Sequence, residues 1–171
     1  MTESTANDTI DTLLDLKPGM VTHSTRHQRE KVVLATQGSE NGLFDPNLAG
    51  LSLTERLLAA LFACQLTPAQ ALAQVYQSRL EHAQADPVTV QQVLCGDLSQ
   101  INVPRLKAIL TFTHILITDP VRADRHALTA LKEAGLTTPE VVTLAQLIAF
   151  VSYQVRLAAG LNAMKALEQQ V

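Results

Sequence analysis

The 24 residues from Val141 to Met164 carry a single formal charge, that of Arg156. A helix of this composition must cover apolar surface on most of its sides, either inside the protein or against another subunit. Its longest uncharged part, residues 141–155, is interrupted by polar side chains and is shorter than the ~20 apolar residues that span a bilayer. We therefore predict a central or subunit-contacting helix in a protein that has no membrane partner.

The composition of the whole chain supports self-association. The chain has 171 residues, of which 47% are apolar and 17% charged, with a formal net charge of −3. Soluble proteins carry about 25% charged residues, so a monomer would have few charges with which to cover its surface. We predict a homo-oligomer, and the absence of a basic surface argues against a nucleic-acid partner.

The length suits one domain, which we place at residues 10–171 after a flexible tail at residues 1–9. The tail is polar and acidic and lacks the basic and apolar regions of a secretory signal, so a cytoplasmic protein is expected.

Helix start and stop signals are frequent, whereas strand-like alternation is almost absent, which predicts an all-α fold. Ser52 and Glu55 have the spacing of a capping box, in which each side chain binds a free amide of the other residue. The Thr67-Pro68 and Thr138-Pro139 pairs each suggest an N-cap followed by a proline in the first turn. The predicted helices cover residues 10–16, 27–36, 53–66, 68–83, 88–94, 104–117, 124–134 and 138–167, with a loop at 37–50.

Common catalytic and metal motifs are missing from the sequence. It contains no glycine-rich phosphate loop, no nucleophile elbow and no histidine-rich metal motif. Cys64 and Cys95 lie 31 positions apart, and neither belongs to a Cys-x-x-Cys pair. We predict no metal and no cofactor, and we interpret both cysteines first as buried small apolar residues in a reducing compartment.

Polar side chains recur on the last predicted helix at Gln146, Tyr153 and Arg156, on roughly one face of an apolar rod. Because an unpaired buried charge is costly, Arg156 needs a partner. It either pairs with a carboxylate and holds helices in register, or it lines a small-molecule pocket together with Tyr153 and Gln146.

Two further residues have a structural and a catalytic interpretation. His114 follows Leu110 by one helical turn, so it is either a satisfied core histidine or a general base. Glu55 is either the capping residue described above or a carboxylate that relays protons. His23 and His27 are expected at solvated surface positions.

The sequence resembles the alkylhydroperoxidase and carboxymuconolactone decarboxylase superfamily over about 130 residues. Residues 110–161 are similar to the end of its peroxidase-related branch: a turn at 116–120, the Ala-Gly-Leu run at 134–136, and the aromatic-x-x-Arg-Leu-Ala motif at 153–158. Residues 37–61 are similar to a subgroup known only as domain proteins of this superfamily. The resemblance implies an all-helical, alkylhydroperoxidase-like bundle.

The resemblance also implies where a peroxidase site would lie. Peroxidases of this superfamily have a Glu, a Cys-x-x-Cys about fourteen residues later and a His one turn further on. Glu55 matches the Glu, but the thiol positions fall near Ala69 and Leu72 and the His near Tyr76. A dithiol mechanism needs a reactive thiolate and a neighbouring thiol to resolve the sulfenic acid, and Cys64 has no such neighbour in the sequence.

Three functions are compatible with these residues. The first is a small-molecule-binding or structural protein that has lost the dithiol site. The second is a cofactor-free decarboxylase or isomerase of a small organic acid or lactone that uses Glu55, His114 or Arg156. The third is a one-cysteine peroxidase built on Cys64. We favour the first, and we leave open whether the protein is an enzyme.

Overall fold

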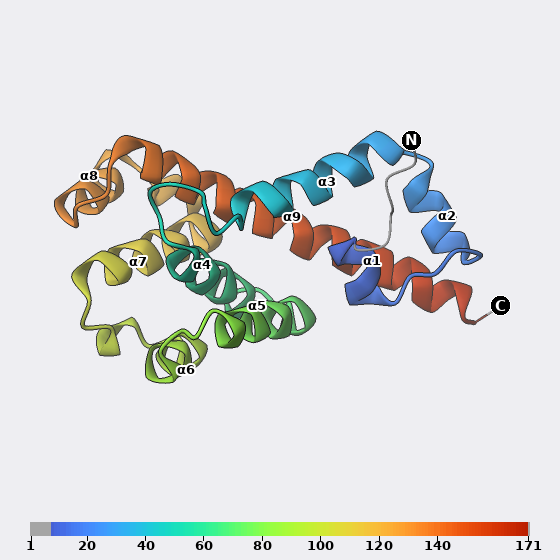
Figure 1. Ribbon diagram of the computed structural model, residues 1–171, viewed down its shortest axis with the longest axis horizontal. Helices are drawn as coiled ribbons and strands as arrows, with labels where there is room; N and C mark the ends of the chain where they lie inside the picture. The colour runs from blue at the N-terminus through green and yellow to red at the C-terminus, as the bar shows by residue number, and fades with distance from the viewer. Residues whose placement is uncertain (1–7, 171) are drawn as a thin grey trace. The chain divides into compact units, whose positions relative to one another are not determined.

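The computed structural model describes residues 8–170, and within that range all regular structure is helical, which confirms the predicted all-α fold (Figure 1). The α-helices are α1 (Thr9–Leu14), α2 (Val21–His27), α3 (Glu30–Leu43), α4 (Leu53–Gln65), α5 (Gln70–His82), α6 (Pro87–Cys95), α7 (Pro104–Thr118), α8 (Arg125–Glu133) and α9 (Thr138–Glu168). Two short 3-10 helices, η1 (Leu98–Gln100) and η2 (Pro120–Arg122), precede and follow α7.

The chain divides into two compact units. Of the described residues, unit 1 comprises 8–42 and 153–170, and unit 2 comprises 43–152. The single domain predicted for residues 10–171 stays a prediction. Of the predicted tail, residues 1–7 lie outside the described residues, whereas Asp8 caps α1 and Thr9 is its first residue.

Helix α4 forms the centre of unit 2. Every residue from Arg56 to Cys64 is buried, and α4 packs against α5, α6 and α7. Figure 1 shows α4 and α5 side by side. Small residues such as Ala59, Ala60 and Ala63 allow this close approach on several sides of one helix. A helix buried all round needs no polar face, which explains the run of uncharged residues after Arg56.

Most predicted helix ends in unit 2 are confirmed. Ser52 Oγ accepts a hydrogen bond from the Glu55 amide at 3.1 Å, and Glu55 accepts one from the Ser52 amide at 2.8 Å, so the capping box is present. Pro104 opens α7, and Gly135 has the left-handed φ of +86° after α8.

One predicted helix start is wrong. The helix expected from residue 68 begins at Gln70, and its N-cap Ala69 makes no side-chain cap. Thr67 donates its hydroxyl hydrogen bond backward, to the carbonyl of Ala63 at 3.0 Å, so it completes the last turn of α4 instead of starting α5. Thr hydroxyls can bond either way along the chain, and the sequence alone does not distinguish the two.

Unit 1 has a small core of its own in which Ile10, Leu16 and Leu161 are buried. The C-terminal part of α9 is held there by polar contacts. Lys165 donates to the carbonyl of Leu14 at 2.6 Å, and the carboxylate of Glu168 accepts hydrogen bonds from two amides at the start of α2. This glutamate acts as a cap for α2, because the N-cap residue Met20 makes no side-chain cap.

The loop predicted for residues 37–50 is wrong over its first half, because α3 continues to Leu43. Gly38 and Gly42 disfavour a helix, but one face of α3 is buried through Val33, Thr36 and Glu40, which are three and four positions apart. Such packing outweighs weak local preferences. The sequence left residues 17–26 without a helix, which is wrong because α2 lies at Val21–His27. The helix predicted from residue 27 begins at Glu30 instead.

By length and composition, α9 is the described helix that could cross a membrane. A long helix of a soluble protein passes the same test. On α9, Leu144, Leu147 and Val151 are buried, whereas Val142 and Leu167 are exposed in the single chain. Singly exposed apolar side chains are common on protein surfaces, and the homo-oligomer stays a prediction.

Candidate functional site

Glu55 lies at the start of α4, and its two carboxylate oxygens make different contacts. One carboxylate oxygen closes the capping box with Ser52, and the other accepts a hydrogen bond from Nε of Arg105 at 2.7 Å. Arg105 also binds an oxygen of Glu140, at the start of α9, and the carbonyl of Gly135. Arg105 therefore links the first turns of α4, α7 and α9.

Glu140 is the most strongly held carboxylate of this cluster. It accepts hydrogen bonds from the amide and the hydroxyl of Thr137, each at 2.7 Å, and it forms an ion pair with Arg105. The Thr137 bonds and the nearby guanidinium lower the pKa of Glu140 to about 2. Because both carboxylates are committed to main-chain amides and to Arg105, the cluster serves helix capping first, which is the structural interpretation given above for Glu55.

His114 is not in the core. Its side chain is exposed on α7, where it lies 3.4 Å from the hydroxyl of Thr118, and its ring centroid is 6.4 Å from that of Phe62. The expectation of a core histidine is therefore wrong, because α7 buries Leu110 and Thr113 but turns position 114 outward. Glu55 and His114 contact different neighbours, and catalysis through either residue stays a prediction.

The polar face predicted on α9 is exposed and not buried. Gln146 and Arg156 are exposed, and Tyr153 is 39% exposed although its hydroxyl is 2.9 Å from that of Thr36. Beside Tyr153, Gln154 is buried, and it donates a hydrogen bond to the carboxylate of Glu40 at 2.8 Å. The prediction of a buried polar face is therefore wrong: the face with Gln146, Tyr153 and Arg156 points outward, and adjacent positions on a helix point in different directions.

The two cysteines differ sharply in accessibility. Cys64 is 2% exposed in the middle of α4, whereas Cys95, the last residue of α6, is exposed. Neither is in a disulfide. The expectation that both are buried is confirmed for Cys64 and wrong for Cys95, whose helix ends at the surface before Gly96. Peroxide must reach a thiolate to oxidise it, so burial of Cys64 weighs against the one-cysteine peroxidase.

We expect the folded protein to show one fast and one slow thiol. With an aromatic disulfide reagent, Cys95 should react at least about 100-fold faster than Cys64, because only unfolding or opening of α4 exposes the latter. The Cys95→Ser variant isolates the slow reaction, and denaturant should make both thiols equally fast. Rapid labelling of folded Cys95→Ser would contradict the burial and would restore the one-cysteine peroxidase.

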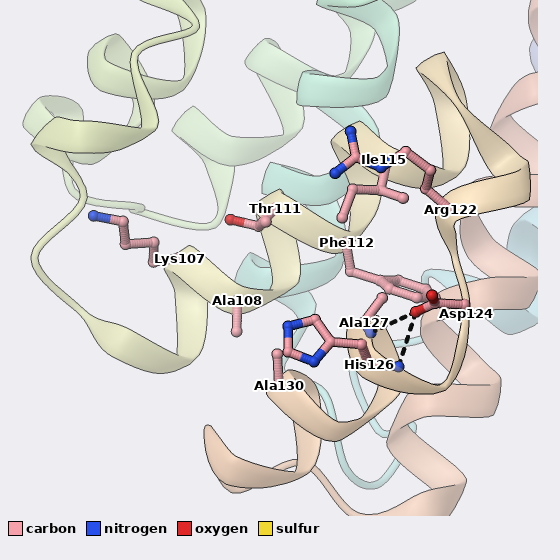
Figure 2. Close-up of a pocket in the computed structure, with 10 residues that line it drawn as sticks. All are labelled: Lys107, Ala108, Thr111, Phe112, Ile115, Arg122, Asp124, His126, Ala127 and Ala130. Carbon is pink, nitrogen blue, oxygen red and sulfur yellow. Dashed lines mark hydrogen bonds between the residues drawn. The ribbon is translucent and has the colours of Figure 1, made fainter.

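A pocket of about 540 Å³ lies between α7 and α8 in unit 2 (Figure 2). Its size is within the range of small-molecule sites. Phe112 and Ile115 from α7 and Ala127 from α8 give it an apolar lining. The complete lining is formed by Lys107, Ala108, Thr111, Phe112, Ile115, Arg122, Asp124, His126, Ala127 and Ala130.

Charged groups on the pocket are predominantly cationic. Lys107 and Arg122 carry positive charges, and Asp124 is the acidic residue of the lining. The Asp124 carboxylate caps α8 by accepting hydrogen bonds from the amides of Ala127 and His126, as Figure 2 shows, and these bonds lower its pKa. Asp124 keeps its negative charge, so a ligand in the pocket would meet the two cationic groups of Lys107 and Arg122 and one anionic group.

None of the pocket residues was among the candidates chosen from the sequence. Lys107, Thr111 and Ile115 recur at steps of four on α7, which places them on one face, but any solvated helix shows such a mixture. Asp124 had the stronger signal, since an Asp before a short amphipathic helix is typical of an N-cap. Nothing in the sequence indicates that α7 and α8 leave space between them.

The fold is similar to that of two solved peroxidase-related proteins. An uncharacterised peroxidase-related protein from Silicibacter sp. TM1040 matches with a TM-score of 0.69 and 14% identity, over 77% of this chain and 69% of that chain. An uncharacterised peroxidase-related protein from Ralstonia eutropha JMP134, described as an alkylhydroperoxidase AhpD core, matches with a TM-score of 0.60 and 19% identity, over 80% of this chain and 71% of that one.

The chain thus has the all-helical fold of peroxidase-related proteins, and in particular that of the alkylhydroperoxidase AhpD core, as the resemblance implied. No family model matches the sequence, and a search of curated proteins finds no significant match. A shared fold at this level of identity does not by itself carry an activity.

Proposed function

We propose that this protein binds a small organic molecule on an AhpD-like fold and does not perform the dithiol peroxidase reaction. The α7–α8 pocket is the observation that carries the binding proposal, because it combines a small-molecule volume with an apolar lining and a few polar groups. The absence of a local thiol pair in the sequence supports the second half: the positions that the resemblance assigns to the two thiols and the His hold Ala69, Leu72 and Tyr76.

The pocket suits an amphipathic organic anion. Apolar side chains such as Phe112 and Ile115 would contact a hydrocarbon or aromatic body. Lys107 and Arg122 would attract a carboxylate or a similar anionic group, and Arg in particular can bind a carboxylate through two parallel hydrogen bonds. A neutral molecule of the same shape would gain only the apolar part of this interaction.

Binding of a fluorescent fatty-acid analogue, 11-(dansylamino)undecanoate, tests the proposal. Ala108→Phe should fill the pocket and weaken binding by about tenfold or more, which corresponds to about 1.4 kcal/mol. Ala71→Phe, at an exposed alanine of α5, is the matched control and should bind like the unmodified protein. Equal affinity of all three proteins, or no binding to any, would contradict a ligand site in the α7–α8 pocket.

A charge variant separates the two parts of the site. Lys107→Met should weaken binding of the anionic probe and leave binding of the corresponding neutral amide unchanged, since only the anion interacts with the ammonium group. Turnover of an organic hydroperoxide is measured on the same preparations with a dithiol reductant. Turnover by the unmodified protein that Cys64→Ser abolishes would overturn the proposed absence of peroxidase chemistry.

A further inference from the structure

Two histidines and one aspartate converge in unit 1. His23 and His27 are one turn apart on α2, and Asp11 lies in α1. The Nε2 atom of His27 is 2.7 Å from Oδ2 of Asp11, and Nε2 of His23 is 3.9 Å from the same oxygen. One ligand atom from each residue thus lies within 4.8 Å of the other two.

The three side chains already lie close together without a ligand, although the two rings must turn from their stacked position for both Nε2 lone pairs to point at one ion. The two imidazole rings stack with their centroids 4.1 Å apart and an angle of 16° between their planes. The side chains of His23, His27 and Asp11 are 18%, 19% and 13% exposed, so they are mostly buried but still accessible to a small ion. The expectation that both histidines are solvated is therefore wrong, because α1 covers this side of α2.

The charge around the cluster favours a cation. Arg26 pairs with Asp8 at 3.0 Å and with Oδ1 of Asp11 at 2.6 Å, which leaves Oδ2 of Asp11 facing the histidines. Leaving the histidines aside, two carboxylates against one guanidinium give a formal local charge of −1. A divalent cation would be attracted by this charge and would find a nitrogen donor on each ring.

The donor set and its dimensions match a first-row transition metal. Zn²⁺ binds imidazole nitrogen and carboxylate oxygen at about 2.0–2.1 Å, which in a tetrahedral site sets neighbouring donors about 3.3 Å apart. The two distances from Asp11 Oδ2, 2.7 and 3.9 Å, lie on either side of that value. Three protein ligands leave the fourth position for water.

We propose that Asp11, His23 and His27 form a binding site for one divalent transition-metal ion, with Zn²⁺ as the preferred ion. The His-x-x-x-His spacing on α2 is the sequence signal for it, since two histidines one turn apart share a helix face. The site lies in unit 1 and is independent of the proposed ligand pocket in unit 2. This proposal departs from the expectation of no metal, which rested on the lack of a longer motif.

Calorimetric titration of Zn²⁺ into the metal-free, untagged full chain tests the site. We expect one ion per chain, and we expect His23→Ala and Asp11→Asn each to weaken binding by about 10- to 100-fold or more. His82→Ala, which removes an exposed histidine of α5 whose Nδ1 lies 2.7 Å from the carbonyl of Ser78, is the matched control and should bind like the unmodified protein. Circular dichroism establishes that each variant is folded.

Two further measurements, of Co²⁺ absorption and of thermal stability, test the site independently of calorimetry. Co²⁺ bound at the site should give the intense visible absorption of a four-coordinate ion, and His27→Gln should abolish it. Zn²⁺ should raise the melting temperature of the unmodified protein but not that of His23→Ala, because only a folded site binds the ion. Absence of Zn²⁺ binding by the unmodified protein, or binding that the cluster variants leave unchanged, would overturn the proposal.

Discussion

Replacing Arg56 with methionine should lower the free energy of unfolding by about 3 kcal/mol. Arg56 is fully buried in α4, and its guanidinium donates to the carbonyl oxygens of Leu43 at 2.5 Å and Asp45 at 2.9 Å. Its Nε also donates to the carbonyl of Ser52 at 3.3 Å. Methionine fills much of the same volume but removes the guanidinium. The Leu43 carbonyl then loses its hydrogen bond from Arg56, whereas the carbonyls of Asp45 and Ser52 keep those from the amides of Leu48 and Arg56.

Urea unfolding followed by circular dichroism measures this effect. Arg56→Lys should recover little of the stability, because one ammonium group cannot reproduce the planar set of donors that reaches both carbonyls. Arg125→Met, at an exposed arginine of α8, is the matched control and should change stability by less than about 0.5 kcal/mol. An Arg56→Met protein as stable as the control would mean that the segment before α4 does not depend on this side chain.

Replacing Gly50 with alanine should destabilise the protein by about 3 kcal/mol, for two reasons that add. Gly50 has a φ of +94°, a backbone angle that residues with a Cβ rarely adopt. An added Cβ would also lie 2.8 Å from Cγ of Glu140, the carboxylate that Thr137 and Arg105 hold. The new methyl group must displace that side chain, and its hydrogen bonds weaken with it.

The Gly96→Ala variant is a control that has the unfavourable backbone conformation but no contact between the added methyl group and a neighbour. Gly96 has a φ of +72°, but no atom lies within 4 Å of the position where its Cβ would be. We expect this control to lose about 1 kcal/mol, the cost of the backbone conformation alone. The difference between the two variants in the midpoint of urea unfolding therefore measures the contact with Glu140. Equal midpoints would show that Glu140 moves aside without loss.

Local signals in the sequence were sufficient for much of the fold. The capping box at Ser52 and Glu55 and the proline at position 104 act within a few residues, so short-range chemistry predicts where α4 and α7 begin. The errors arose where distant packing decided the outcome, or where a side chain had two possible local partners. Helix α3 continues past Gly38 because one of its faces is buried, and Thr67 bonds backward to α4. A sequence pattern does not contain either contact.

The candidate site was less predictable than the fold. Glu55 was recognised, but its partner Arg105 is 50 positions away and had no distinguishing pattern. The α7–α8 pocket depends on how two helices pack, and the polar face predicted on α9 points outward, with Tyr153 exposed and Gln154 beside it buried. The histidine pair on α2 was visible as a spacing, but the approach of Asp11 from α1 gives that spacing its chemical meaning.

The ion pairs of Arg105 have a consequence for the order of events in folding. They join residues 50 and 35 positions apart, whereas the capping bonds of Glu55 and Glu140 each span three. Closing long loops is entropically slow compared with forming a helical turn. We therefore expect each helix start to be capped while the chain is still open, so that both carboxylates are already oriented when Arg105 reaches them. Glu55 and Glu140 would then act twice in folding: each first caps the start of its own helix, and both later bind Arg105 when the helices of unit 2 pack together.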